Sequence, residues 1–498
     1  MTMQVFVDGF NFPTSIAVAL DGTLYLAESG LAFAGAPPGG VIWRILADGR
    51  RERVFDGLRA PVNGLLWHAD GLIISEGGHP GRILRLDLDR GDCQVLVDGL
   101  PGFGNYHTNM VALGPDGRFY FSQGAMTNTA VMGPDSIDLA WLGEREHNAD
   151  IPGYDIELAD VVGISPGPDG QPTRTGAFAP FGSVHPPGTR LPGRTPCTAA
   201  VLRCNPDGSG LELFAWGLRN AYGLGFLPDG RLLATDQGAD VRGLRPVWNC
   251  PDFLYEVKPG AWYGWPDHFG GLAIDHPRFR GPDGRAQSPV LARHDLLPPP
   301  ERAVLEFDVN ACAVKFAVIP PGVAHAGDLV VAQFGDERPM TGPAGPQVAR
   351  NLVRVAVADW SLHSVTADGP LRPLDVAFSA DGAWLYVVDF GAFEFTAAKR
   401  IEARAGSGRL WRMPAATLEQ TTMMTRVSFE RDIAPLFVQY RASMLWRLDL
   451  SNYEDMKLNA DMILSQIDSQ SMPPPPYPPM TPTQIVLFKA WMQQGFPP

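Results

Sequence analysis

The sequence has little that would let it bind nucleic acid or cross a membrane. Its 40 Lys and Arg residues are outnumbered by 54 Asp and Glu residues, which gives a formal net charge of -14. An acidic chain repels nucleic acid and anionic membranes, and no basic stripe of the kind that a nucleic-acid surface requires is found in it. No apolar run approaches the roughly 20 residues of a membrane helix. We therefore expect no nucleic-acid partner and no membrane span.

Cysteine is also scarce, and none of the five cysteines forms a Cys-x-x-Cys pair. They are Cys93, Cys197, Cys204, Cys250 and Cys312. Isolated cysteines of this kind are most often small buried apolar residues. A disulfide between Cys197 and Cys204 is the alternative, which spacing alone does not establish.

The N-terminus lacks a recognisable secretion signal. The segment from Met1 to Asp8 has no basic region and no long apolar run, and it continues directly into strand-like sequence. Two interpretations stay open: the protein remains in the cytosol, or a signal is missing from this chain.

A hairpin pattern recurs along the first 415 residues. Each copy has a polar loop, a short apolar strand, a turn that is most often Asp-Gly, a second apolar strand, and an acidic or amide residue near a Gly. The copies span residues 13–30, 61–78, 107–124, 219–238, 313–335 and 372–391. Asp-Gly favours the positive φ of a tight hairpin, and the 55 Gly and 47 Pro residues agree with many such turns.

Further strand-like segments follow most copies, so each unit has about four strands in roughly 50 residues, the size of a propeller blade. One blade cannot bury both of its faces, and six stacked blades can. The pattern predicts an all-β six-bladed β-propeller over residues 1–415, with a β-sandwich as the less favoured alternative. Two long insertions, 134–196 in the third blade and 239–309 in the fourth, are expected to shape a site.

After residue 415 the sequence pattern changes from strand-like to helical. Residues 416–425 are predicted to be a linker and residues 426–498 a small helical domain. Ser428 opens one apolar periodic segment, and Ser451-x-x-Glu454 and Thr481-x-x-Gln484 are predicted capping boxes.

The loops before the six innermost strands should meet at one mouth of the propeller channel. They carry a polar ring that contains Ser15, Asn63, His107, Asn109, Arg219, Asn220, Lys315, Arg372 and Asp375. Three cations at one opening could hold an anion, and His107, the only histidine of the ring, is the candidate general base. The alternative is that these are ordinary channel-mouth residues, solvated or paired with Asp375. Glu28, Glu76 and Asp389 are predicted to hydrogen-bond backbone beside the following Gly.

The stretch from Trp216 to Gly271 carries a specific set of motifs. An Arg-Asn pair, an Asp-Gly hairpin, a Gln-Gly segment and a Tyr-Gly-Trp-Pro turn occur in this order. This resembles the glucose/sorbosone dehydrogenase family, soluble six-bladed propellers that use pyrroloquinoline quinone (PQQ) and calcium, and looser similarity covers the whole propeller. The resemblance implies an oxidoreductase that oxidises a sugar or related alcohol by hydride transfer to the quinone. Relatives are mostly periplasmic or secreted.

The family implies roles for individual residues. Arg219 and Asn220 match the pair that holds PQQ, Lys315 and Arg372 match further contacts to its carboxylates, and Asn63 belongs to the same cofactor-binding ring. His107 matches the base that takes the substrate hydroxyl proton. The backbone around Gln237, Gly238 and Ala239 matches the calcium site. The chain departs from the family at Leu374, Ala239 and Tyr106, where the family has an Arg, a Pro and an acidic residue.

The tail resembles a c-type cytochrome domain through Arg431–Phe437, Ser471–Pro474 and the Trp-bearing last helix. Such domains attach haem through Cys-x-x-Cys-His. The corresponding stretch, Val438–Trp446, has neither Cys nor His. We therefore expect no haem on Met472, and a tail that could dock a redox partner.

Two other functions are considered. One is a non-catalytic propeller that has lost the cofactor and binds a ligand or protein. The other is a metal-dependent lactonase, which needs a Glu in the inner loop of the first blade, where this chain has Pro13-Thr14-Ser15.

Overall fold

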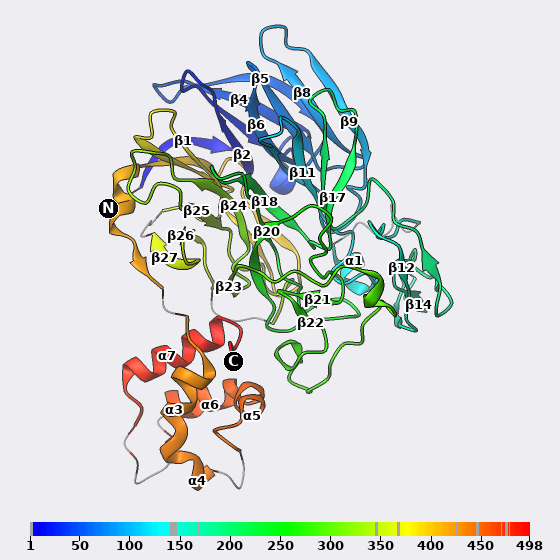
Figure 1. Cartoon of the computed structure of the whole chain (residues 1–498). Coiled ribbons are helices and arrows are strands. Elements are labelled where there is room, and N and C mark those ends of the chain that lie inside the picture. The colour runs from blue at the N-terminus through cyan, green and yellow to red at the C-terminus, as the bar shows by residue number, and fades with distance from the viewer. Residues whose placement is uncertain are drawn as a thin grey trace.

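The computed structural model describes residues 3–498 except 140–146, 168, 344–346, 366–368, 425, 445–447, 470, 474–476 and 478. The regular structure of the described chain is mainly antiparallel sheet, and the C-terminal helices gather beside the sheets, in orange and red in Figure 1. No helix of the described chain is long and apolar enough to cross a membrane.

Six sheets of four or five strands form the blades of the described chain. From the inner strand outward, blade one is β2 (Pro13–Val18), β3 (Leu24–Glu28), β4 (Gly40–Ile45) and β5 (Arg51–Leu58). Blade two is β6 (Val62–His68), β7 (Gly71–Glu76), β8 (Gly81–Asp87) and β9 (Cys93–Leu100). Blade three is β10 (Thr108–Leu113), β11 (Phe119–Gln123), β16 (Ala200–Cys204) and β17 (Glu212–Trp216). Blade four is β18 (Ala221–Phe226), β19 (Leu232–Asp236), β20 (Pro251–Val257) and β23 (Leu305–Val309). Blade five is β24 (Ala313–Val318), β25 (Leu329–Gln333), β26 (Asn351–Ala356), β27 (Ser361–Val365) and β33 (Thr422–Met423). Blade six is β28 (Pro373–Phe378), β29 (Trp384–Asp389), β32 (Gly408–Pro414) and β1 (Gln4–Phe10).

The blades close into a ring. Each innermost strand contacts the innermost strands of both neighbouring blades, and β2 contacts β28 to complete the circle. The N-terminal strand β1 supplies the outer strand of the last blade, where Val7 pairs with Leu410. The predicted six-bladed propeller is therefore confirmed, and the sandwich is not formed.

The repeated turns form as their residue types predict. At the β18–β19 turn, Gly230 has a φ of +90°, and the Asp229 carboxylate accepts the Arg231 backbone N–H at 3.1 Å. β19 is buried along its whole length because neighbouring blades cover both of its faces. Asp389, at the end of β29, accepts backbone N–H groups of Arg372 and Gly391, which confirms its predicted structural role.

The two insertions interlock over one side of the channel. The insertion of the third blade contains α1 (Pro134–Asp138) and two hairpins, β12 (Ile156–Glu157) with β15 (Arg190–Leu191) and β13 (Val162–Pro166) with β14 (Pro172–Gly176). The insertion of the fourth contains the hairpin β21 (His268–Phe269) with β22 (Leu272–Ala273). Leu158 of the first insertion pairs with Leu291 of the second, and Trp265 of the second donates its indole N–H at 3.0 Å to the carbonyl of Asn128, in the loop that leads into the first. Arg245 donates to the Thr129 carbonyl at the same interface.

The predicted linker is part of the propeller edge. Residues Ala415–Gln420 form a 3-10 helix, and β33 pairs with β27 through His363 and Met423. Thr425, the last residue of the predicted linker, lies outside the described residues.

The tail forms short helices around its own apolar core. They are η5 (Phe429–Ile433), α3 (Ala434–Phe437), η6 (Val438–Tyr440), α4 (Arg441–Met444), α5 (Tyr453–Leu458), α6 (Ala460–Asp468) and α7 (Pro482–Gln493). Met472 is buried in that core with Phe437, Phe488 and Trp491. Leu445, Trp446 and Pro474, which belong to the stretches compared with cytochromes, lie outside the described residues.

Two of the predicted helix starts are confirmed and one is wrong. Ser428 caps η5, and Thr481 with Gln484 forms a capping box at the start of α7. α5 is capped instead by Asn452, whose side chain accepts the Asp455 N–H at 3.1 Å. Ser451 donates to the Asp449 carboxylate.

Candidate functional site

A cavity of about 440 Å³ lies where loops of several blades meet at the channel. Its lining includes five residues predicted from the sequence, Asn63, His107, Asn109, Asn220 and Gln237. Its apolar wall is formed by Leu31, Phe33, Tyr222, Phe334, Leu374, Phe390, Phe393 and Phe395. His107 is the one imidazole among the described lining residues. The prediction that inner-strand loops of different blades bring these side chains together is confirmed for this subset.

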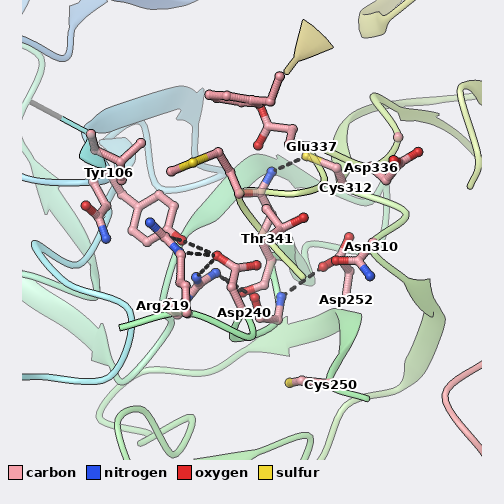
Figure 2. Close-up of a pocket in the computed structure, with 18 residues that line it drawn as sticks. Tyr106, Arg219, Asp240, Cys250, Asp252, Asn310, Cys312, Asp336, Glu337 and Thr341 are labelled. Atoms are coloured by element: carbon pink, nitrogen blue, oxygen red, sulfur yellow. Dashed lines mark hydrogen bonds and ion pairs between the residues drawn. The ribbon is translucent and has the colours of Figure 1, made fainter. Parts of the chain in front are cut away.

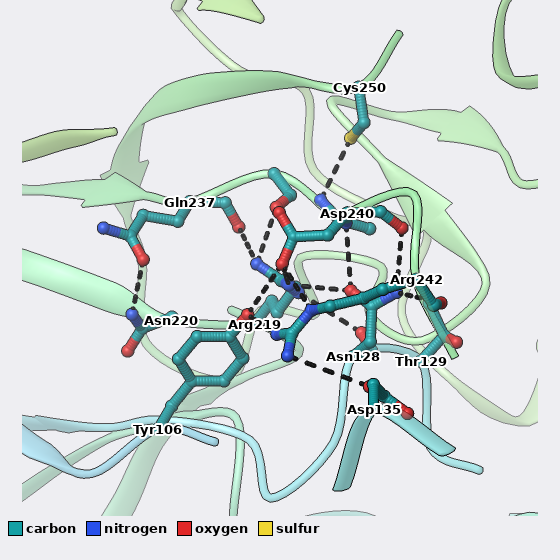
Figure 3. Close-up of polar contacts among 12 residues, drawn as sticks. Tyr106, Asn128, Thr129, Asp135, Arg219, Asn220, Gln237, Asp240, Arg242 and Cys250 are labelled. Atoms are coloured by element: carbon teal, nitrogen blue, oxygen red, sulfur yellow. Dashed lines mark hydrogen bonds and ion pairs between the residues drawn. The ribbon is translucent and has the colours of Figure 1, made fainter. Parts of the chain in front are cut away.

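A chain of hydrogen-bonded amides runs around the cavity. The Asn63 amide donates to Asn109 Oδ1 at 3.3 Å, and the Asn109 amide donates to Asn220 Oδ1 at 2.8 Å. The Asn220 amide in turn donates to Gln237 Oε1 at 2.7 Å, drawn in Figure 3, and Gln237 Nε2 donates to Cys312 Sγ at 2.9 Å. This chain joins blades two to five and fixes the direction in which each amide points.

Arg219 is buried and saturated with internal hydrogen bonds (Figure 3). Its Nη1 donates to the carbonyl oxygens of Gln237 at 3.2 Å and Gly238 at 2.6 Å. Its Nη2 donates to Asn128 Oδ1 at 2.7 Å and lies 2.6 Å from Asp240 Oδ2. Two carbonyls of the predicted calcium segment therefore already accept hydrogen bonds from a cation of the chain.

The same Asp240 carboxylate also binds Arg242. Arg242 Nε lies 2.8 Å from Asp240 Oδ2, and Arg242 Nη2 donates to the Tyr106 hydroxyl at 2.6 Å. Burial raises the pKa of the Tyr106 hydroxyl, so this group stays protonated. Arg219 lies over the Tyr106 ring with 4.5 Å between its guanidinium carbon and the ring centre. Tyr106, the neighbour of His107 in the sequence, thus packs against this pair of arginines.

Lys315 is also paired inside the protein. Its Nζ donates to the Thr14 carbonyl at 2.8 Å and lies 3.2 Å from Asp375 Oδ2. Ser15 donates to the same Asp375 oxygen at 2.8 Å. Burial lowers the pKa of Lys315. Lys315 is not among the described residues that line the cavity, and the alternative interpretation of the ring, pairing with Asp375, is confirmed for this residue.

Arg372 lies behind the aromatic wall. It donates to the carbonyl oxygens of Phe393, Phe334 and Asp336 at 3.1, 3.1 and 2.7 Å, and its Nη2 lies 2.8 Å from Glu394 Oε2. It lines a separate surface hollow with Arg350 and Glu394. The expectation that three cations face one opening is therefore wrong: of the three, Arg219 alone reaches the hollows at the channel mouth.

A second hollow of about 200 Å³ adjoins the cavity and shares Tyr106, Gln237, Cys312 and Glu337 with it. Asp240, Asp252, Asp336 and Glu337 surround this hollow (Figure 2). Burial raises the pKa of Asp252 to about 7, although its oxygens accept the backbone N–H groups of Gly238 and Ala313. In the described part of the chain, no group of three or more His, Cys, Asp or Glu residues is arranged to hold a metal ion.

All five cysteines are free. Cys197 and Cys204 are buried, as expected of small apolar residues, and they form no disulfide. Ala239, the third residue of the predicted calcium segment, donates its N–H to Cys250 Sγ at 3.3 Å.

Comparison with known proteins adds structural neighbours but no sequence relative. No model of a protein family and no curated protein matches the chain. Similar solved structures include the PQQ-bound aldose sugar dehydrogenase of Streptomyces coelicolor, with 17% identity, a TM-score of 0.48, and coverage of 82% of this chain and 96% of that chain. A putative oxidoreductase (glucose dehydrogenase) of Thermus has 17% identity and a TM-score of 0.47, covering 82% and 98%. A gluconolactonase of Xanthomonas campestris has 16% identity and a TM-score of 0.38, covering 83% and 89%. The structural neighbours thus include a sugar dehydrogenase, a putative oxidoreductase and a gluconolactonase.

The side chains at the channel mouth do not fit PQQ as they are arranged. The quinone carries three carboxylates, which need Arg or Lys donors that are not committed elsewhere. Each predicted cation already pairs with a carboxylate of this chain: Arg219 with Asp240, Lys315 with Asp375, and Arg372 with Glu394. The cofactor and calcium roles that the resemblance implies for these residues stay predictions, and the contacts of the cations do not favour them.

The sequence pattern did not indicate Asn128 or two of the acidic partners, Asp240 and Glu394. Asp240 and Glu394 lie in loops that the repeat pattern leaves out, and their pairing with cations of other loops has no local signal. Asp375 was recognised because it occupies a repeat position.

Proposed function

We propose that the propeller binds a sugar or related polyhydroxylated alcohol in the channel-mouth cavity. The observation that carries this proposal is the amide chain from Asn63 to Gln237, which lines the same cavity as the aromatic wall. Amides both donate and accept, as hydroxyl groups do, and ring faces pack against the C–H groups of a sugar. A neutral ligand needs no free cation. The three carboxylates of PQQ, by contrast, would have to compete with Asp240, Asp375 and Glu394 for the cations that these residues already pair.

Within this proposal the His107 imidazole forms a hydrogen bond with a hydroxyl group of the bound ligand. Its imidazole belongs to the same lining as Asn109 and Asn220. A neutral imidazole has one ring nitrogen that donates and one that accepts, so it can hydrogen-bond a hydroxyl group.

Ligand-detected NMR with a panel of neutral aldoses, ketoses and polyols tests the proposal. Leu374, which lines the cavity, is replaced in Leu374→Trp so that the indole fills the space. Leu20→Trp makes the same change at a residue that is 86% exposed and serves as the matched control. We expect at least one sugar to bind the wild type and the Leu20 variant but not the Leu374 variant. Because Leu374→Trp could disturb folding, Asn220→Ala is the second variant. A signal that survives both cavity changes, or no signal from any panel member, would overturn the proposal.

The second candidate is the PQQ- and calcium-dependent dehydrogenase predicted from the sequence. It is favoured by one observation, that His107, Asn220 and Gln237 line one cavity. Arg219 and Asn220 would hold the quinone there, and the cofactor would supply the hydride acceptor. Arg219 would first have to leave the carbonyls of Gln237 and Gly238. Sugar-dependent dye reduction after addition of PQQ and calcium would establish it.

No observation favours a lactonase. The first blade contributes Thr14, Leu31 and Phe33 to the described lining, and no carboxylate. Thr14 is itself engaged, because its hydroxyl donates to the Val62 carbonyl at 2.5 Å.

A further inference from the structure

Glu337 is the acidic residue that both hollows share. It lies between β25 and β26 in blade five, and Figure 2 labels it beside Cys312 and Asp336. Because the two hollows meet at Glu337, a ligand in the channel-mouth cavity lies within reach of this carboxylate.

The other carboxylates around the second hollow are already satisfied. Asp240 binds two arginines, and Asp252 accepts two backbone N–H groups. Asp336 accepts the Val348 N–H at 2.9 Å and lies 3.4 Å from Arg338 Nε. Among the described residues, the Glu337 carboxylate alone of these four has neither a hydrogen bond nor an ion pair. Burial raises the pKa of Glu337, with Asp240 and Asp336 adding to the effect and Arg372 and Arg242 opposing it.

The Glu337 side chain is partly exposed in both hollows, and its carboxylate has no partner among the described residues, so it is open to a ligand there. The chemistry that satisfies it best is a cationic N–H donor, since charge-assisted hydrogen bonds are the strongest kind in a protein. The rings of Phe334, Phe393 and Phe395 in the adjoining wall would also favour a positive charge. Arg372 and Arg242 also act on the Glu337 carboxylate, but each is paired with a different carboxylate, Glu394 and Asp240.

We infer that Glu337 recognises a basic nitrogen on the ligand, which makes the ligand an amino sugar or a related polyhydroxylated amine. This inference rests on the proposed sugar-binding function and narrows its ligand class. Glu337 acts in it as a specificity-determining residue, with the amide chain holding the hydroxyl groups.

Calorimetric titration with matched sugars tests the inference. Glucose, galactose and mannose are each compared with the 2-amino sugar and the N-acetylated 2-amino sugar, at a pH where the free amine is protonated. The wild type should bind at least one amino sugar about tenfold more tightly than its neutral and acetylated counterparts. Glu337→Gln should abolish this preference and leave the affinity for the neutral sugar within a factor of about three. Glu419→Gln, at an exposed position after the last blade, should behave as the wild type.

The outcomes separate the inference from the function on which it rests. Equal binding of amino and neutral sugars, or a preference that survives Glu337→Gln, would overturn the role of Glu337 and leave sugar binding intact. Absence of binding for every sugar of the set would overturn both. Loss of all binding in Glu337→Gln, with its unfolding temperature unchanged, would show that Glu337 holds hydroxyl groups and not an amine.

Discussion

Arg219 and Asp240 form a buried ion pair, with 2.6 Å between Nη2 and Oδ2 and with only 2% and 13% of their side chains exposed. The pair joins the loop before β18 to the loop after β19. Because the same guanidinium also binds the carbonyls of Gln237 and Gly238, Arg219 supports the wall of the cavity. The resemblance to quinone dehydrogenases predicts that Arg219 binds a cofactor. Its side chain instead binds Asp240 and two backbone carbonyls of this chain.

Removing the cation of this pair should destabilise the propeller. Arg219→Met leaves the Asp240 carboxylate with one arginine and leaves two carbonyls without their donor. Breaking a buried pair on one side costs about 3–5 kcal/mol, so the unfolding temperature should fall by several degrees in a thermal melt. The double variant Arg219→Met/Asp240→Leu removes both charges and should recover part of the loss. A single variant that melts like the wild type would show that the pair has no structural role.

The amide chain should control ligand affinity as well as stability. Asn109 accepts from Asn63 and donates to Asn220, so Asn109→Ala interrupts the chain in its middle. We expect sugar affinity to fall about tenfold and the free energy of unfolding to fall by about 1–3 kcal/mol. Asn205→Ala, which removes an amide from the β16–β17 turn, is the control and should leave affinity unchanged. Equal effects of the two substitutions on affinity would contradict this role.

The helical tail should be fixed to the fourth blade by Arg278. This residue is 2% exposed; its Nη1 lies 2.8 Å from Glu306 Oε2, and its Nε and Nη2 donate to the Gly495 and Gln494 carbonyls at 3.1 and 3.3 Å. Arg278→Ala should release the tail, so that a protease cuts between the propeller and the tail faster than in the wild type. Arg285→Ala changes an exposed arginine of the same insertion and should not alter the cleavage rate. Unchanged cleavage in Arg278→Ala would show that other contacts suffice.

Lys457 should make the attachment of the tail depend on pH. Its Nζ donates to the carbonyls of Pro277 and Arg278, and burial, with Arg278 and Arg280 nearby, lowers its pKa to about 7 against the favourable effect of Glu454. His276 also lies near Lys457. Between about pH 7 and the unfolded value of 10.5, the unfolded chain binds a proton that the folded chain lacks, so stability should rise with pH. Lys457→Met should flatten this rise in melts recorded between neutral and alkaline pH. A wild type whose tail loses stability as the pH rises through this window would contradict the assignment.

The blades were predictable because their signals are local. Each Asp-Gly turn, such as Asp229-Gly230, sets its own hairpin, and the repeat places Asn63, His107 and Asn220 at the channel mouth. The partners of the cations were not predictable, because they are set by contacts between distant loops, as between Arg372 and Asp336. The predicted N-cap of α5 is one residue too early. Ser451 and Asn452 are both favourable N-cap residues, so the sequence alone does not show which of them begins the helix.

The central claim is that the cations of the channel mouth serve the fold and that the cavity accepts a sugar without a quinone. Calorimetric titration of the full chain with PQQ in the presence of calcium, run beside the sugars, tests it most directly. We predict saturable binding of a sugar with neither PQQ nor calcium present, and no saturable binding of PQQ. One-to-one binding of PQQ that depends on calcium, is lost in Arg219→Lys, and brings sugar-dependent dye reduction would contradict the account.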